Sequence, residues 1–157
     1  TNTFFSKDLN NSKNFAWTYV KGIVRDPDNG PTGYEEHDWM YNKPFFTSEH
    51  NQLKYDRHYP VVKSIINKLK IKKLLNVRAN LLVPTKEHIC HEFHTDLNVP
   101  HKVALFYVTE NNGWTVLKDI AKVECVKNRM LLFDGLIDHH SVSSTDNVRC
   151  VININYN

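Results

Sequence analysis

Four residues of types that bind metals or anions stand at spacings that suit a shared site. His94 and Asp96 lie two positions apart in the segment "HEFHTDLNVPHKVALFYV", which begins at His91. Residues i and i+2 of a strand point to the same face, so both side chains can reach one ion. His139 or His140 offers a third ligand. Two histidines and one carboxylate leave three adjacent coordination positions open, and this facial arrangement suits non-haem iron(II).

Arg149, on the last predicted strand, adds a group that can bind an anion beside the candidate metal ligands. A buried guanidinium is costly unless it meets an anion, and its planar fork grips a carboxylate through two hydrogen bonds. The sequence therefore predicts an anionic cosubstrate beside the metal. Neighbours on a strand face opposite ways, so only one of His139 and His140 can reach the ion. By the same alternation, His88, His91 and His94 do not converge on zinc, and we expect His88, His91 and His101 at the surface or in loops.

Short runs of β-branched, aromatic and alternating residues predict about eight strands in the second half of the chain. The fold class predicted is mainly β, a double-stranded β-helix or jelly roll with at least one packing α-helix in the N-terminal half. The segment "TENNGWT" is typical of a tight hairpin turn. The predicted strands lie at 76–84, 88–97, 102–108, 113–117, 121–126, 129–133, 139–144 and 148–156.

The N-terminal half is less regular. Apolar residues recur at helical spacing in "YPVVKSIINKLKI", which predicts a helix over 59–72 with Pro60 near its start. Residues 1–58 are rich in aromatics and turn formers, and we expect an N-terminal segment with loops. Within it, "HDWMYNKPFF" (37–46) is the first candidate for a substrate-facing lid. With 75–157 as the jelly-roll core, the length favours one domain over 1–157.

The amino-acid composition indicates which class of protein the chain belongs to. The chain is 41% apolar and 24% charged, with a formal net charge of +3, as in ordinary folded proteins. Much of the positive excess lies in "KSIINKLKIKK", for which a solvated helix face is the favoured interpretation. Cys90, Cys125 and Cys150 have no C-x-x-C spacing and are expected to be buried free thiols. No segment is apolar enough to span a membrane, and we expect a soluble, cytoplasmic protein.

The motifs "HTD", "NNGWT" and "FDG" with a downstream "HH" and Arg149 follow one another in an order that resembles the 2-oxoglutarate and Fe(II)-dependent dioxygenases. The nearest resemblance is to the compact prolyl-4-hydroxylase-like proteins common in marine phages, and it covers about residues 75–157. It implies an oxidoreductase that uses Fe(II), 2-oxoglutarate and O2, with ascorbate as the reductant in an assay. If the source is viral, the compartment is the host cytoplasm.

Residue by residue, the resemblance implies that His94 and Asp96 are the first two iron ligands. It favours His139 over His140 as the third, because His139 stands five residues after Asp134 and ten before Arg149. Arg149 would pair with the distal carboxylate of 2-oxoglutarate. Candidates for further contacts around the cosubstrate are Asn80, Tyr107, Thr115 and Asn153. Leu82 departs from the family pattern, since relatives often place a polar or tyrosine contact on that strand.

The activity implied is hydroxylation of a protein or peptide side chain, coupled to decarboxylation of 2-oxoglutarate to succinate and CO2, with no catalytic residue beyond the metal ligands. One alternative is a nucleic-acid dealkylase of the same fold, although its relatives usually read R-x-N-x-T-x-R where this chain reads "RCVININ". Another is a non-catalytic, cupin-like binding or virion protein. No sequence feature specifies the oligomeric state or a membrane partner.

Overall fold

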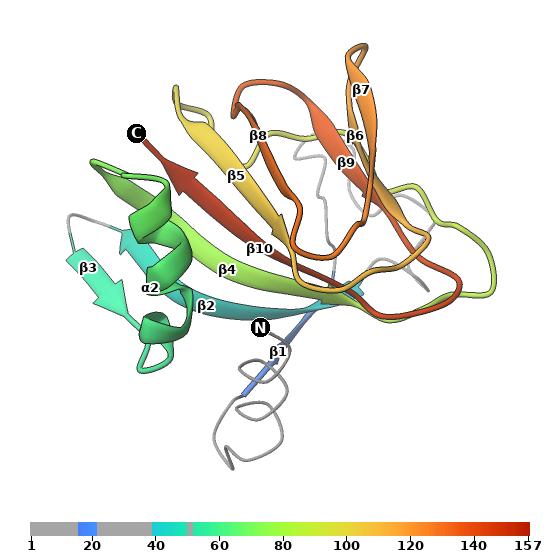
Figure 1. The fold of residues 1–157 in the computed structure, drawn as a ribbon, viewed down its shortest axis with the longest axis horizontal. Coiled ribbons are helices and arrows are strands. Elements are labelled where there is room, and N and C mark those ends of the chain that lie inside the picture. The colour runs from blue at the N-terminus through green and yellow to red at the C-terminus, as the bar shows by residue number, and fades with distance from the viewer. Residues whose placement is uncertain (1–15, 22–38, 50–51) are drawn as a thin grey trace.

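The computed structural model describes residues 16–21, 39–49 and 52–157 of the 157-residue chain. Within them, one helix and ten strands follow in order (Figure 1). The elements are β1 Thr18–Lys21, β2 Trp39–Glu49, β3 Gln52–Tyr55, α2 Tyr59–Lys68, β4 Leu74–Leu82, β5 Lys102–Tyr107, β6 Trp114–Leu117, β7 Ala121–Glu124, β8 Met130–Asp134, β9 His139–Val142 and β10 Arg149–Tyr156. In these ranges, no helix is long and apolar enough to cross a membrane.

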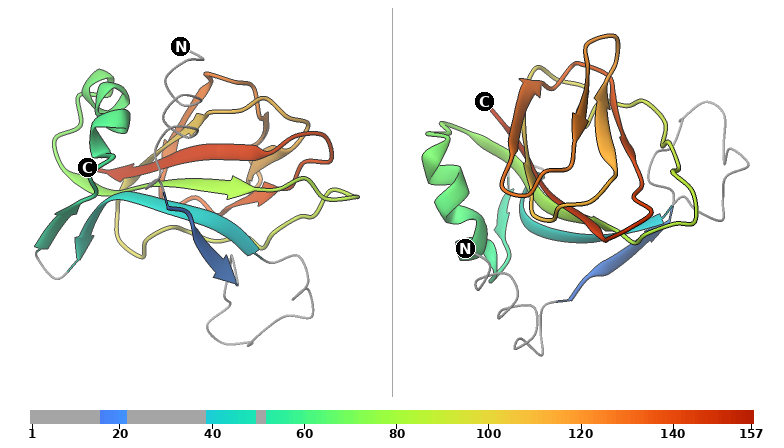
Figure 2. Two further views of the ribbon diagram at one scale, coloured as in Figure 1. Left: turned by 90° about the horizontal axis from the view of Figure 1, so that it is seen from below. Right: turned by 45° about the vertical axis from the view of Figure 1, so that its right-hand side comes forward.

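The strands form two antiparallel sheets. The larger has the order β1-β2-β4-β10-β5-β8, with β3 also paired to β2, and the smaller has the order β7-β6-β9. Figure 2 shows the smaller sheet stacked over one end of the curved larger sheet. Mainly β, with two facing sheets and one helix, the fold is the predicted double-stranded β-helix.

Strand alternation gives the larger sheet two chemically different faces. On β10, Ile152 and Ile154 pack with Val77 and Ala79 of β4 in an apolar core. At the alternate positions β10 carries Asn153 and Asn155. They lie opposite the β4 residues whose side chains point to the same face of the sheet. One face of the sheet is therefore an apolar core, and the other combines polar side chains with a second, smaller apolar cluster that contains Leu105 and Val151.

The helix α2 covers the apolar face. Val62 and Ile66, four positions apart, are buried in the same core as Val77 and Ala79. Pro60 lies in the first turn, where its missing N–H costs no hydrogen bond. The predicted helix is confirmed but is shorter than 59–72, since Lys70 adopts a positive φ of 50° and the chain leaves the helical path.

Three local predictions are wrong. Residues 39–49 belong to the segment 1–58, which was expected to contain loops, but they form the long strand β2, which pairs with β4. The segment "TENNGWT" is no hairpin: β5 pairs with β10 and β8, whereas β6 pairs with β7 and β9, so it carries the chain between sheets. Residues 88–97 make only two isolated bridges rather than a strand. All three cysteines are free as predicted, but Cys90 is exposed.

A largely buried ion pair joins β2 to the start of α2. Lys43 Nζ lies 2.9 Å from Asp56 Oδ2, and Asp56 Oδ1 accepts a 2.9 Å hydrogen bond from the backbone N–H of His58. The Lys43 side chain is 8% exposed. Burial alone would raise the pKa of Asp56, but Lys43 and His58 more than offset it and hold the pKa at about 2.

We expect Asp56→Ala to lower the free energy of unfolding by about 2 kcal/mol, because it removes the carboxylate beside a buried ammonium. In the wild type this contribution is complete above the ordinary carboxyl pKa and is lost as the pH falls towards about 2. Urea denaturation at pH 7 measures the change. Asp138→Ala is the matched control, since it breaks the exposed Lys118–Asp138 pair and should cost under about 1 kcal/mol. Equal losses in the two variants would contradict the prediction.

Candidate metal centre

Backbone pairing brings His94 and His139 together. Each donates its N–H to the other's carbonyl oxygen at 3.0 Å, which forms an isolated antiparallel bridge. Residues directly opposite in such a pair hold their side chains side by side. The two imidazole rings accordingly lie 4.7 Å apart between centroids. One irregular segment and the first residue of β9 thus supply two adjacent nitrogen atoms as candidate metal ligands.

Hydrogen bonds to backbone carbonyls fix which nitrogen each ring presents. His139 Nδ1 lies 3.0 Å from the carbonyl oxygen of Ile137, and His94 Nδ1 lies 3.2 Å from that of Glu92. A carbonyl only accepts, so in each ring Nδ1 carries the donated hydrogen. The lone pair therefore sits on Nε2 of both histidines, which is the state a metal ligand needs.

Asp96 is the acidic member of the group, and its carboxylate is almost fully buried, with 1% of the side chain exposed. Arg78 Nη2 donates to Oδ1 at 2.8 Å, and Asn153 Nδ2 donates to Oδ2 at 2.9 Å. These contacts come from β4 and β10 and fix the plane of the carboxylate. Oδ2 keeps a free lone pair and lies 3.9 Å from Nε2 of His139.

Electrostatics favours the forms that bind metal. Burial opposes ionisation of Asp96, but the Arg78 guanidinium, together with the hydrogen bond from Asn153, outweighs it and holds the pKa below its usual value. For His139 burial has the larger effect. It lowers the pKa of the imidazole, and the neighbouring Asp96 carboxylate raises the pKa by less. At neutral pH the site therefore offers an ionised carboxylate and a neutral imidazole.

One ligand atom from each of His94, Asp96 and His139 lies within 4.8 Å of the others. An ion about 2.1 Å from each donor requires donor separations of about 3 Å, so the side chains must close by only about 1–2 Å. Among the described residues this is the single group of three or more histidine, cysteine or acidic side chains so placed.

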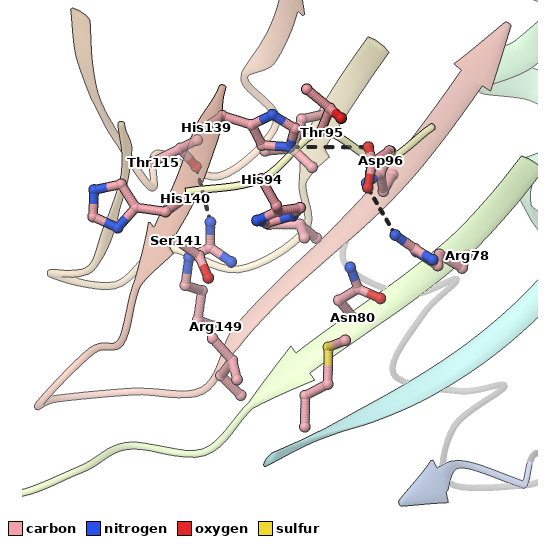
Figure 3. A pocket seen from close by; sticks show the side chains of 15 residues that line it. Arg78, Asn80, His94, Thr95, Asp96, Thr115, His139, His140, Ser141 and Arg149 are labelled. Carbon is pink, nitrogen blue, oxygen red and sulfur yellow. Dashed lines mark hydrogen bonds and ion pairs between the residues drawn. The ribbon is translucent and has the colours of Figure 1, made fainter. Parts of the chain in front are cut away.

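His140, the alternative third ligand, does not belong to this group. Figure 3 shows its ring pointing away from Asp96, while the ring of His139 points towards it. The His140 ring packs instead against Phe93, with 4.4 Å between centroids. This divergence is the strand alternation expected of neighbours on β9.

A second cluster, around Arg149, lies beside the three ligands. Arg149 is 3% exposed, and its Nη2 donates to Thr115 Oγ1 at 2.9 Å. Tyr107 donates its hydroxyl to the same oxygen at 2.8 Å. Arg149 Nε is buried without a hydrogen-bond partner, and no carboxylate among the described residues pairs with the guanidinium. Burying a cation without a partner of opposite charge is costly, so this position is suited to binding an anion.

Both clusters line one pocket of about 280 Å³ (Figure 3). Its wall contains His94, Asp96, His139, Arg149, Asn80, Thr115 and Asn153. Tyr107 is absent from the wall and instead supports Thr115 from behind. Asn153 contacts Asp96 directly, whereas Asn80 accepts a 2.8 Å hydrogen bond from Asn42. Of the lid candidates at 37–46, Met40 reaches the wall.

Sequence reasoning missed Arg78, although the necessary pattern was present. Arg78 shares the parity of Asn80 on β4 and therefore faces the same interior. His88, His91 and His101, which were expected at the surface or in loops, all lie outside the strands, but only His88 is exposed. His91 is 9% exposed, with Nδ1 2.8 Å from the carbonyl oxygen of Ser141, and His101 is 4% exposed. Backbone carbonyl groups contact both rings, that of Ser141 in β9 at His91 and that of Val99 at His101, and no spacing rule anticipates such contacts.

Comparison with known proteins finds relatives by structure alone. No protein-family model matches the chain, and no curated protein matches its sequence. An oxidoreductase of the 2OG-Fe(II) oxygenase family from Burkholderia pseudomallei aligns with a TM-score of 0.62 and 9% identity, covering 97% of this chain and 78% of that one. The likeness establishes the fold.

Two further structures align over most of the chain. A prolyl hydroxylase from Trichoplax adhaerens, in complex with a hypoxia inducible factor peptide fragment, gives a TM-score of 0.53 at 10% identity, covering 98% of this chain and 88% of that one. The DMSP lyase DddQ from Ruegeria pomeroyi gives 0.54 at 8% identity, covering 90% of this chain and 56% of that one. The same scaffold thus occurs in proteins of different named activities, so function must be argued from the site.

We expect His139→Ala to weaken Co(II) binding by more than about 100-fold, since it removes a direct ligand, whereas His140→Ala should change it by less than about threefold. Equilibrium dialysis with metal analysis measures both. Metal loss in the His140 variant alone would reverse the assignment.

Arg78→Met should weaken Co(II) binding by about 10–100-fold, because the Asp96 carboxylate loses the donor that orients it. Arg78→Lys, which restores a cationic donor, should recover part of the affinity. Isothermal titration on folded, metal-free protein measures the change, with Arg129→Met as the matched control outside the pocket. Tighter binding in Arg78→Met would instead mean that repulsion between the guanidinium and the metal dominates.

Proposed function

We propose that the chain is a single Fe(II)- and 2-oxoglutarate-dependent dioxygenase domain that hydroxylates a protein or peptide side chain. The observation that carries the proposal is the pairing of two sites in one pocket. A buried arginine that pairs with no carboxylate in the described part of the chain lies beside two imidazoles and one carboxylate that can close on an ion. A metal site alone, or a buried arginine alone, would be far less specific.

The donor set fits iron(II). Two neutral imidazole nitrogens and one carboxylate oxygen leave room for further ligands from outside the protein. Closed structural zinc sites, in contrast, take four protein ligands, and the described residues offer no fourth side chain in this group. The residues that would hold iron are His94, Asp96 and His139.

Arg149 and Thr115 fit the distal carboxylate of 2-oxoglutarate. Thr115 Oγ1 accepts from both Arg149 and Tyr107, which occupies its two lone pairs. Its own hydroxyl hydrogen is then available to a ligand in the pocket. Together with the guanidinium, it forms a pair of donors for a carboxylate at the end of the pocket next to the metal ligands (Figure 3).

When bound, iron and 2-oxoglutarate supply the oxidation, in which O2 converts the cosubstrate to succinate and CO2 and leaves one oxygen atom on the substrate. The chain's own residues orient the groups that would hold the iron and exclude water from the pocket. Arg78 and Asn153 hold the plane of Asp96. Leu82, Leu105 and Val151 give the pocket apolar walls that limit the entry of water. No side chain is needed as a general base, since the chemistry belongs to the bound groups.

The substrate class is proposed on two grounds. One solved structural neighbour is a prolyl hydroxylase with a bound peptide fragment. At the pocket, Phe93 packs on His140 and remains 44% exposed, which offers an apolar contact to a segment lying across the opening. Extended peptides are well suited to such a rim, since they bury apolar side chains while their reactive residue enters the pocket.

We expect anaerobic protein with Fe(II) and 2-oxoglutarate to develop a visible charge-transfer band and, in air with ascorbate, to form succinate slowly without substrate. Arg149→Met should weaken 2-oxoglutarate binding by about 10–100-fold and Thr115→Val by about tenfold, with iron binding retained. Titration of the band measures both affinities.

Arg129→Met is again the control, because the Arg129 guanidinium donates to the backbone carbonyl oxygen of Glu124 and is not part of the pocket wall. Absence of the band in the wild type would contradict the dioxygenase proposal. Equal affinity in the wild type and the Arg149 variant would contradict the role of that residue. For the substrate, a mass increase of one oxygen on peptides would support the side-chain hydroxylase, whereas loss of the methyl group from methylated oligonucleotides would support the dealkylase.

A further inference from the structure

Five lysines gather around α2 and the turn that follows it. Lys63 and Lys68 lie on the helix and Lys70, Lys72 and Lys73 follow directly, and all five are exposed. A ten-residue helix is about 15 Å long, so these charges lie within about 20 Å of one another. We call this group the lysine face.

The lysine face carries little compensating negative charge. From residue 57 to residue 86 the sequence contains no aspartate or glutamate. Asp56, just before this stretch, is engaged by Lys43 and His58. No ion pair between described residues involves any of the five lysines. Uncompensated charge of one sign produces a potential that attracts polyanions.

The lysine face is separated from the pocket by the larger sheet. On β4, Val77 and Ala79 pack in the core beneath α2, while Arg78 and Asn80 line the pocket on the other face. Figures 1 and 2 show α2 beside β3 and the C-terminal end of β10, away from β6 and β9. A ligand on the lysine face would therefore leave the pocket open.

An exposed aromatic ring adjoins the lysine face. Tyr55 of β3 is 58% exposed, and its ring lies 4.8 Å from that of Tyr59 in the first turn of α2 and 4.9 Å from that of the buried Phe46. Tyr59 and Lys63 are four positions apart and share a side of the helix. A ring supported by packing, exposed, and next to lysines is the arrangement on which unpaired bases stack.

A membrane surface is a poorer partner for the same charges. A helix that binds membranes buries its apolar face in the lipid. In α2 that face is Val62 and Ile66, which are already buried against the larger sheet. Between the lysines, the outer side of α2 carries Ser64 and Asn67, both exposed and polar. Nothing on this side of the helix could insert among acyl chains.

We propose that the lysine face, with Tyr55, is a binding surface for single-stranded nucleic acid, separate from the pocket. The lysines contact phosphates, which provides affinity without sequence preference. Tyr55 stacks on a base, which favours an unpaired strand over a duplex, whose bases are already stacked. The surface holds a strand on the side of the sheet opposite the pocket, and the proposal stands whether or not the pocket is catalytic.

The test is fluorescence anisotropy with a labelled 20-nucleotide oligothymidine and the full chain, from 50 to 300 mM NaCl. Binding should weaken with salt, with a logarithmic slope of about −2 to −3.5, as expected for three to five phosphate contacts on a single strand. The triple variant Lys63→Gln, Lys68→Gln and Lys72→Gln should bind at least tenfold more weakly at 50 mM NaCl.

The matched control is Lys86→Gln, Lys118→Gln and Lys122→Gln, which removes the same charge from exposed positions outside the lysine face and should bind within twofold of the wild type. Circular dichroism verifies that both triple variants are folded. Tyr55→Ala should lose about fivefold or more for the single strand but little for a duplex of equal length, and Tyr55→Phe should retain wild-type affinity.

Three results would overturn the proposal. Equal losses in the two triple variants would show that net charge, rather than this surface, governs binding. Equal affinity for single strand and duplex, unaffected by Tyr55→Ala, would remove the stacking contact. Tighter binding to vesicles of three parts phosphatidylcholine and one part phosphatidylserine than to the oligonucleotide would assign the lysines to a membrane.

Discussion

The buried carboxylate of Asp96 is the constraint on which the polar interior of this fold depends. With 1% of its side chain exposed, an ionised carboxyl is stable only because donors surround it. Arg78 reaches it from β4 and Asn153 from β10, while His139 faces it from β9 in the other sheet. One side chain from the irregular segment between β4 and β5 is thus bonded to two strands of the larger sheet and faces a candidate ligand of the smaller one. Removing any one donor would leave charge in a low-dielectric interior.

The same interior explains why the site has two halves. Asp96 is compensated by Arg78, so its region is close to neutral before any ion binds. Arg149, in contrast, has no carboxylate partner among the described residues, and its guanidinium donates to the hydroxyl of Thr115. The pocket therefore combines a preformed set of metal donors with an unmet demand for an anion. A bidentate ligand with a second carboxylate would satisfy both, which is the reason for proposing 2-oxoglutarate.

The larger sheet separates this chemistry from the lysine face. Alternate residues of β4 and β10 point to opposite sides, so one set of strands supports an apolar core under α2 and a polar pocket on the other side. The apolar side is covered by a helix whose outer surface is free to carry charge. Two surfaces with different partners can therefore coexist on a small scaffold, because neither shares side chains with the other.

The sequence by itself determined the fold class, the helix and the candidate metal ligands, since alternation, helical spacing and residue chemistry are local properties. Spacing and resemblance identified His94, Asp96 and His139 as candidate metal ligands, and the structure brings the three side chains together. Tertiary structure alone decided the rest. That β2 is a strand, that "NNG" joins two sheets and that Arg78 meets Asp96 depend on pairings between segments far apart in the chain. Such pairings follow from the packing of the whole sheet, and no local pattern encodes them.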